Sequence, residues 1–186
     1  DLDLFGFWFA LAIFSLLTTL WLPYQGEEAV YTITSMEMYD SQDWFVPTQY
    51  GLNYARPPLL NWLMIPLATL LGWQQVLVAS RLLTVIITLC TSLLLIWFAE
   101  KCFKNRALAF FSALIYLSGD VLFRRGWLAY ADPLFTLCVF AAMACLWVAL
   151  QEKRYSLVVL AILGVIASFL AKAITGYVFY GITLLV

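Results

Sequence analysis

The sequence contains no histidine and few charged residues, and both absences narrow what the chain can be. Only 11% of its 186 residues are charged, against about 25% in soluble domains. Without histidine, neither a histidine metal site nor histidine acid–base catalysis is available within these residues. The net charge of −1 gives no electrostatic reason to expect a nucleic-acid partner. The chain is 65% hydrophobic, which is typical of an integral membrane protein.

The cysteines give no sign of a metal or redox site. There are four of them, Cys90, Cys102, Cys138 and Cys145, all in or beside apolar runs. None belongs to a CxxC pair, so we interpret them as small buried hydrophobic side chains. We therefore predict no metal ligands and no cofactor. A divalent cation stays open as an alternative, although nothing in the sequence indicates one.

Apolar runs long enough to cross a membrane recur along the chain. About 20 apolar residues span the hydrocarbon core. The predicted spans are residues 4–22, 76–99, 107–123, 133–150 and 155–171, and residues 173–186 begin another. The first run lacks a small-residue cleavage pattern, so we expect a retained span and not a signal peptide. The predicted fold class is all-α, a polytopic transmembrane helical bundle that forms one membrane domain over residues 1–186. Because the chain stops inside an apolar run, we expect it to be a piece of a longer protein.

The topology depends on residues 58–72, a short apolar segment interrupted by Pro66. Two loops rich in Lys and Arg, residues 100–106 and 151–154, are separated by two spans, and short loops of this kind stay in the cytoplasm. If residues 58–72 cross the membrane, both basic loops lie outside. If they do not cross, both basic loops are cytoplasmic, so the positive-inside bias favours this second arrangement. We therefore predict that residues 23–75 form an outer loop with juxtamembrane or re-entrant helices.

In that arrangement, charged residues from separate loops and helix ends gather at the outer face. They are Glu27, Glu28, Arg56, Arg81, Asp120, Arg124, Arg125, Asp132 and Lys172. Charges at a membrane edge usually face a cavity or one another, so we expect a site there. For Arg124 and Arg125, snorkelling to the interface is the alternative. For Asp132, the alternative is a helix N-cap before Pro133, which would also hold the carboxylate rigid.

The outer loop offers a specific place for an anion. Residues 28–39 have a helical periodicity that fits a short helix lying on the membrane surface. Pro57 and Pro58 suit the start of a second helix, whose free N–H groups can receive an anion. Arg56 lies just before that start, so a phosphate there would meet a guanidinium and a helix N-terminus together. Interfacial anchoring is the alternative role for Arg56.

Three stretches of this loop resemble a known family. They read Gly26-Glu27-Glu28-Ala29-Val30-Tyr31, then Gln42-Asp43-Trp44-Phe45-Val46-Pro47, then Tyr54-Ala55-Arg56-Pro57-Pro58-Leu59-Leu60-Asn61-Trp62. They resemble the N-terminal half of the membrane glycosyltransferases that use polyprenyl-phosphate sugars, the superfamily of protein O-mannosyltransferases and lipid A aminoarabinose transferases. Later parts of the same pattern resemble Arg81-Leu82, Ala131-Asp132-Pro133-Leu134 and Lys172, so the match runs in order along nearly the whole chain.

The resemblance implies the multispan fold called GT-C, with its active site on the outer side of a membrane, here expected to be a bacterial inner membrane. It implies an inverting transfer of a sugar from a polyprenyl-phosphate donor to a lipid, glycan or protein acceptor, with membrane lipids as further partners. Glu27 matches the family's catalytic aspartate, and Asp132 matches its second acid. Arg56 matches a lysine that contacts the lipid phosphate. The other candidate substrate-binding residues are Glu28, Tyr54, Arg81 and Lys172.

The chain also departs from the family pattern. Glu27 replaces an aspartate, Val30 stands where the family often has arginine, and Ala55 stands where it often has glutamate. A divergent subfamily or a degenerate member would both show these changes. Two other classes of function therefore stay open, a membrane transporter or flippase and a non-catalytic membrane subunit. Charges near the membrane midplane would mark a transporter, whereas here most charges cluster at span ends.

Overall fold

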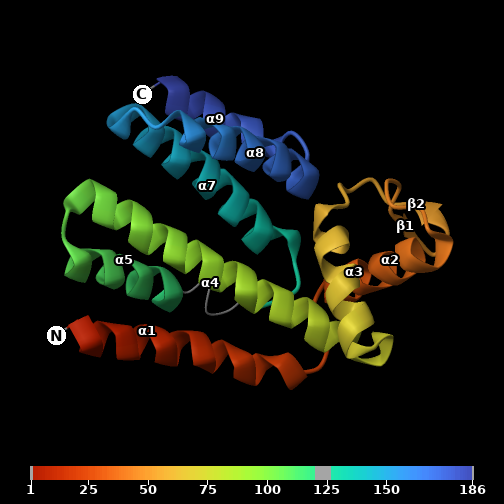
Figure 1. The fold of residues 1–186 in the computed structure, drawn as a ribbon. Coiled ribbons are helices and arrows are strands. Elements are labelled where there is room, and N and C mark those ends of the chain that lie inside the picture. The colour runs from red at the N-terminus through yellow and green to blue at the C-terminus, as the bar shows by residue number, and fades with distance from the viewer. Residues whose placement is uncertain (1, 120–126, 186) are drawn as a thin grey trace.

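The computed structural model describes residues 2–119 and 127–185, and it consists of a bundle of long helices with a smaller helical layer at one end (Figure 1). The bundle comprises α1 (Leu2–Leu17), α4 (Val76–Phe103), α5 (Arg106–Ser118), α7 (Ala131–Glu152), α8 (Tyr155–Lys172) and α9 (Thr175–Leu185). The end layer comprises α2 (Glu28–Ser41), α3 (Leu59–Leu71), strands β1 (Thr48–Gln49) and β2 (Leu52–Asn53), and the 3-10 turns η1 (Thr18–Trp21) and η2 (Trp73–Gln75). The predicted all-α bundle is confirmed.

Four helical stretches of the described residues are long and apolar enough to cross a membrane. They are Asp3–Trp21, Trp73–Phe103, Ala131–Glu152 and Tyr155–Lys172. Each overlaps one of the spans predicted from the sequence, whose membrane placement stays a prediction. The helix within predicted span 107–123 is the shorter α5, and the rest of that span lies outside the described residues, as do Asp120, Arg124 and Arg125.

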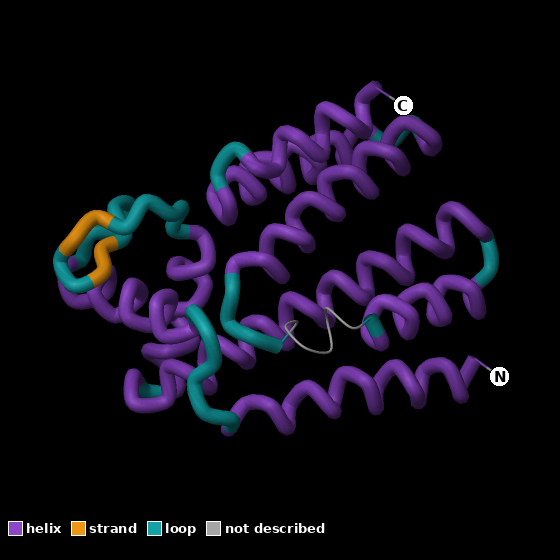
Figure 2. Tube along the Cα trace, turned by 180° about the vertical axis from the view of Figure 1, so that it is seen from behind, coloured by secondary structure: helices purple, strands orange, loops and turns teal. Residues whose placement is uncertain are grey.

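The two basic loops lie together at one end of the bundle. Lys104 and Lys153 take left-handed conformations that end α4 and α7. Asn105 caps α5, because its side chain accepts bonds from the backbone N–H groups of Ala107 and Leu108. Lys101 Nζ lies 2.6 Å from Glu152 Oε1, which joins the two loops directly. The strand pair lies at the opposite end from these loops, as the view from behind also shows (Figure 2).

The helices α2 and α3 pack on the far end of α4 and meet α7 there. A buried apolar cluster joins them, with Tyr31 from α2, Leu60 and Met64 from α3, Ala79 from α4 and Phe135 from α7 among its members. Packing of this kind stabilises the end layer as a unit with the bundle, because the large side chains fill the space between the helices at close-packed density and are shielded from water. The end layer is thereby held over the first turn of α7.

Close packing of α8 on α7 depends on a small residue. A Cβ atom at Gly164 would lie 3.0 Å from the backbone nitrogen and Cβ of Ala142 and from the carbonyl oxygen of Cys138. Small residues let helices in a membrane approach closely. The close contact runs α8 beside α7, so the last residue of α8, Lys172, lies beside the first turn of α7.

Within the end layer, Glu37 holds the turn between the two short strands. Its carboxylate accepts bonds from Thr48 Oγ1 at 2.7 Å, from the Tyr50 amide at 2.6 Å and from the Gly51 amide at 3.2 Å. Tyr50 and Gly51 both have positive φ, which a tight hairpin turn requires. The bond from Thr48, aided by the two backbone amides, lowers the pKa of Glu37. This turn fixes the start of the segment that leads to Arg56.

Candidate active site

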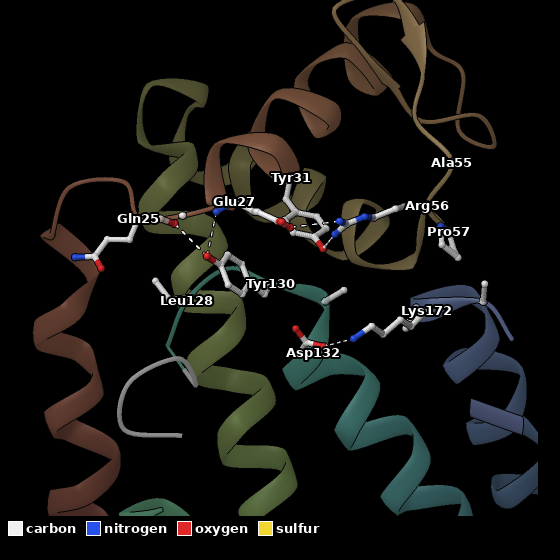
Figure 3. A pocket seen from close by; sticks show the side chains of 14 residues that line it. Gln25, Glu27, Tyr31, Ala55, Arg56, Pro57, Leu128, Tyr130, Asp132 and Lys172 are labelled. Carbon is white, nitrogen blue, oxygen red and sulfur yellow. Dashed lines mark hydrogen bonds and ion pairs between the residues drawn. The ribbon is translucent and has the colours of Figure 1, made fainter. Parts of the chain in front are cut away.

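A cavity of about 720 Å³ opens where residues 25–57 meet the start of α7 and the end of α8 (Figure 3). Four charged side chains line it, and they come from four separate segments of the chain. They are Glu27 before α2, Arg56 before α3, Asp132 in the first turn of α7 and Lys172 at the end of α8. The two acids that the sequence suggested as catalytic therefore line one cavity together with two cations.

Glu27 and Arg56 form an ion pair on one wall of the cavity. Arg56 Nη2 lies 3.3 Å from Glu27 Oε2, and Nη1 of the same guanidinium donates to the hydroxyl of Tyr31. The guanidinium carbon also lies over the rings of Tyr31 and Tyr54, at 5.4 and 5.3 Å from their centroids. Tyr54 is not among the residues that line the cavity, so it contacts Arg56 without lining the cavity itself. Three neighbours thus orient the Arg56 guanidinium.

The start of α3 has a smaller part in the site than the sequence suggested. Pro58 occupies its N-cap position and is buried, and α3 begins at Leu59. From this region, Ala55, Arg56 and Pro57 line the cavity, but no residue of the α3 helix does. The cation at Arg56, rather than the N–H groups of a helix end, therefore faces the cavity.

Asp132 and Lys172 form the second ion pair of the cavity, with Lys172 Nζ donating to Asp132 Oδ1. The alternative role of Asp132 as an N-cap is wrong, because α7 begins one residue earlier, at Ala131, and Tyr130 is its N-cap. An acid in the first turn and a lysine in the last turn both complement the helix dipoles of α7 and α8. Both side chains remain accessible from the cavity.

Tyr130 links the two acidic segments, and sequence reasoning missed it. Its hydroxyl accepts a hydrogen bond from the Glu27 amide at 3.0 Å and donates to the Gln25 carbonyl oxygen at 3.4 Å. Gly26 permits this contact, because its φ is +57° and a Cβ atom there would lie 2.0 Å from the Tyr130 hydroxyl oxygen. The only available signal was position, since Tyr130 stands directly before Ala131-Asp132-Pro133.

Tyr31 was also missed, although the helical repeat points to it. It lies four residues after Glu27, and residues four apart share one face of a helix. Its side chain is buried, and burial raises its pKa, although the charge of Arg56 opposes that shift. The phenol therefore stays protonated and can accept from Arg56 while its own O–H remains a donor.

Glu28 and Arg81, two of the predicted substrate-binding residues, lie inside the protein and do not line the cavity. Both side chains are fully buried and pair through two bonds, Arg81 Nη2 to Glu28 Oε2 at 2.6 Å and Nε to Oε1 at 2.9 Å. The Arg81 guanidinium also lies 5.0 Å from the centroid of the Trp127 ring. A pair sealed from the cavity in this way has no access to a substrate.

The buried pair instead joins the segments that carry the site. Arg81 donates to the carbonyl oxygens of Thr19, Leu22 and Pro23 at 2.8, 2.5 and 2.8 Å. Glu28 accepts from the backbone amides of Gln25 at 2.9 Å and Ala129 at 3.0 Å. The Glu28–Arg81 pair therefore joins four parts of the chain. They are the residues after α1, the start of α2, helix α4, and the residues that lead into α7.

The residues of this site can do two kinds of chemistry. Carboxylates such as Glu27 and Asp132 can take a proton from a hydroxyl, and a guanidinium or an ammonium can hold a phosphate. Among residues 2–119 and 127–185, no group of three or more cysteine, aspartate or glutamate side chains is arranged to hold a metal ion.

Comparison with known proteins finds relatives over most of the chain. It is 34% identical over 151 residues to the undecaprenyl phosphate-alpha-4-amino-4-deoxy-L-arabinose arabinosyl transferase of Edwardsiella ictaluri, covering 78% of the chain and 27% of that protein. It is 33% identical over 146 residues to the second such transferase of Proteus mirabilis, covering 76% of the chain and 26% of that protein. The chain is 29% identical over 132 residues to the transferase of Yersinia enterocolitica, covering 71% of the chain and 24% of that protein.

The chain spans about a quarter of the length of these relatives. No protein-family model matches it, and no solved structure does. The resemblance that the sequence motifs indicate is confirmed by these relatives.

Proposed function

We propose that this chain, a relative of the undecaprenyl phosphate-aminoarabinose arabinosyl transferases, carries the catalytic cavity of a membrane glycosyltransferase. The enzyme would move a sugar from a polyprenyl-phosphate donor to an acceptor. One observation carries the proposal: Glu27 and Asp132, from distant segments, line the same cavity as Arg56 and Lys172. That combination supplies both a proton acceptor and phosphate-binding cations.

In the proposed reaction, Glu27 acts as the general base. It takes the proton of the acceptor hydroxyl while the acceptor oxygen forms a bond to the anomeric carbon of the sugar. The bond between that carbon and the phosphate oxygen breaks, and its electron pair leaves with the polyprenyl phosphate. Attack from the face opposite the leaving group inverts the anomeric configuration. Asp132, which its ion pair with Lys172 holds in place, would orient the acceptor.

The two cations of the cavity would stabilise the leaving group. The phosphate gains negative charge as its bond to the sugar breaks, so donors aimed at it favour the transition state over the bound donor. Arg56 is the first candidate, because a planar guanidinium can hold two phosphate oxygens at once. Lys172 is the second, as a point charge on the facing wall. Glu28 and Arg81 would position Glu27 and the start of α7 without touching the substrate.

The donor and acceptor are proposed at the level of class. The names of the relatives support a sugar linked to undecaprenyl phosphate as the donor. The acceptor would be a hydroxyl of a lipid, a glycan or a protein. Ala55 lines the cavity where the family pattern often has glutamate, so the chain's own sugar need not be the aminoarabinose of the relatives' names.

The cavity would face away from the cytoplasm, in a bacterial inner membrane. Its lining residues come from the starts of α2 and α7 and the end of α8. These helix ends lie opposite the two basic loops (Figure 1). Short basic loops stay in the cytoplasm. An outward-facing site suits a lipid-linked donor, because the polyprenyl chain stays in the bilayer while its phosphate and sugar reach the cavity at the membrane surface.

Release of the sugar from a purified polyprenyl-phosphate donor tests the proposal against its alternatives. The full-length protein is reconstituted in lipid vesicles with a radiolabelled donor, and free polyprenyl phosphate and donor sidedness are measured together. A glycosyltransferase forms polyprenyl phosphate in the presence of an acceptor extract. A flippase would move the donor across the vesicle without cleaving it, and a non-catalytic subunit would do neither; either result contradicts the proposal.

A further inference from the structure

Three ion pairs at the end of the bundle that carries the end layer differ sharply in exposure. The side chains of Glu28 and Arg81 are both 0% exposed. Those of Glu27 and Arg56 are 61% and 43% exposed, and those of Asp132 and Lys172 are 63% and 44% exposed. Breaking a buried pair is strongly destabilising, whereas an exposed pair contributes little. The pairs that line the cavity can therefore exchange partners, and the buried pair cannot.

In the proposed reaction two anionic groups compete for Arg56, the Glu27 carboxylate and the donor phosphate. In this structure Arg56 donates to the Glu27 carboxylate, which is the proposed base. The contact uses one acceptor site of Oε2 and pairs the charge of the carboxylate, so taking the proton of a hydroxyl must compete with the ion pair. The donor phosphate needs the same guanidinium, and a bidentate bond from arginine to phosphate is stronger than one long contact to an exposed carboxylate.

Tyr31 and Tyr54 would keep the guanidinium in the cavity during such an exchange. Arg56 Nη1 donates to the Tyr31 hydroxyl, while Nη2, the other terminal nitrogen, contacts Glu27. The two rings hold the guanidinium carbon by cation–π contacts, which do not involve the Glu27 contact. Burial lowers the pKa of Arg56, but Tyr31, Tyr54 and Glu27 outweigh it, so the net pKa is raised and the charge is kept.

Resting on the proposed function, we infer that Arg56 is a switch between two anions. It holds Glu27 as this structure shows, and its Nη2 and Nε groups bond the phosphate instead when a polyprenyl-phosphate donor binds, while Nη1 stays on Tyr31. The exchange releases Glu27, which then takes the proton of the acceptor hydroxyl. Donor binding thereby removes the cation that competes with the proton of the acceptor for Glu27.

Binding of undecaprenyl phosphate, the carrier lipid without a sugar, tests the exchange apart from catalysis. Its affinity is measured in nanodiscs containing the full-length protein, for the wild type, Glu27→Gln, Arg56→Gln and the double variant. If Glu27 competes with the phosphate for Arg56, Glu27→Gln tightens binding about two- to fivefold, the size expected for an exposed ion pair. In the Arg56→Gln background the same change has no effect, because the shared group is gone.

Asp132→Asn is the matched control. This variant removes a carboxylate that lines the same cavity but pairs with Lys172 and not with Arg56. Its effect on binding should be the same in the Arg56 and Arg56→Gln backgrounds, as for any change in overall charge. If Arg56→Gln does not fold, Arg56→Lys is a second test. A lysine keeps the charge but lacks two parallel N–H groups. In that background, Glu27→Gln should tighten the binding of undecaprenyl phosphate less than twofold.

Two results would overturn the inference while leaving glycosyl transfer intact. One is no tightening in Glu27→Gln, and the other is an equal tightening with and without Arg56, which indicates simple charge repulsion. A wild-type protein that does not bind undecaprenyl phosphate at all would instead contradict the proposed donor class, and the inference with it.

Discussion

The hydroxyl of Tyr130 accepts a hydrogen bond at 3.0 Å from the backbone N–H of Glu27. Tyr130 is also the N-cap residue of α7, two positions before Asp132. One phenol therefore fixes the backbone of the first acid relative to the helix that carries the second. Catalytic groups act only within a narrow geometry, so this link bears directly on the proposed reaction.

Tyr130→Phe should impair turnover more than stability. The variant loses the bonds to Glu27 and Gln25 but keeps the ring, and one such hydrogen bond contributes about 1 kcal/mol. We expect kcat to fall about tenfold or more, since small displacements of a catalytic group are costly, with the affinity for undecaprenyl phosphate unchanged. Tyr155→Phe removes a hydroxyl at the other end of the bundle and should leave kcat unchanged. Equal kcat in both variants would contradict the role of Tyr130.

Gly26→Ala should destabilise the protein for two reasons, the strain of a positive φ and a clash with the Tyr130 hydroxyl. Both Gly26 and Gly51 have positive φ, a conformation that costs an alanine roughly 1–2 kcal/mol. At Gly51 nothing lies within 4 Å of the new Cβ, whereas at Gly26 the Tyr130 hydroxyl would lie 2.0 Å away. Thermal unfolding should therefore show a larger loss for Gly26→Ala than for Gly51→Ala.

The extra loss of thermal stability in Gly26→Ala, compared with Gly51→Ala, should shrink when Tyr130 is also changed to Phe, because the clashing oxygen is gone. Equal losses at the two glycines would show that the contact with Tyr130 does not matter.

Glu28→Gln should strongly destabilise the fold. It leaves the Arg81 guanidinium buried without a counter-charge, and breaking a buried pair in this way costs about 3–5 kcal/mol. Arg56→Gln, which breaks an exposed pair, is the comparison and should cost at most about 1 kcal/mol. Melting temperatures measured in the same detergent compare the loss of stability in the two variants. A Glu28→Gln protein as stable as Arg56→Gln would mean that the pair does not hold the end layer together.

The hairpin turn at residues 48–53 should loosen in acid. The pKa of Glu37 is lowered below its ordinary value of 4.5, chiefly by the bond from Thr48. A carboxyl whose pKa is lower in the folded state stabilises above its unfolded pKa, and this contribution is lost as pH falls through the folded value. Hydrogen-exchange protection of the Tyr50 and Gly51 amides should therefore drop as pH falls below about 4.5.

Glu37→Gln should remove that pH dependence, because its side chain does not titrate. Protection that stays constant down to pH 3 in the unchanged protein would contradict the role of Glu37.

Part of this architecture follows from composition and order along the chain. Apolar runs predict the long helices. Two spans separate the two basic loops, which predicts that the loops share one end of the bundle, and Lys101 contacts Glu152 there. The same topology predicts that Glu27, Arg56, Asp132 and Lys172 gather at the other end, and all four line one cavity. Such predictions succeed because a membrane restricts which segments can meet.

The sequence does not distinguish a buried charge from one at a cavity. Glu27 and Glu28 are adjacent and chemically alike, yet one faces the cavity and the other is sealed with Arg81. The first turn of α2 decides this, since neighbouring residues on a helix point in different directions. Tyr31 and Tyr130 were missed for a related reason: aromatics near a membrane surface usually serve as interface anchors, and only their hydrogen-bond partners reveal another role.

The central claim is that Glu27 is the base in a sugar transfer, and turnover of a polyprenyl-phosphate sugar by Glu27→Gln tests it most directly. The account predicts that this variant of the full-length protein still binds undecaprenyl phosphate but that its kcat falls by about 10²–10⁴, the contribution of a general base. A Glu27→Gln enzyme that transfers sugar at the wild-type rate would contradict it.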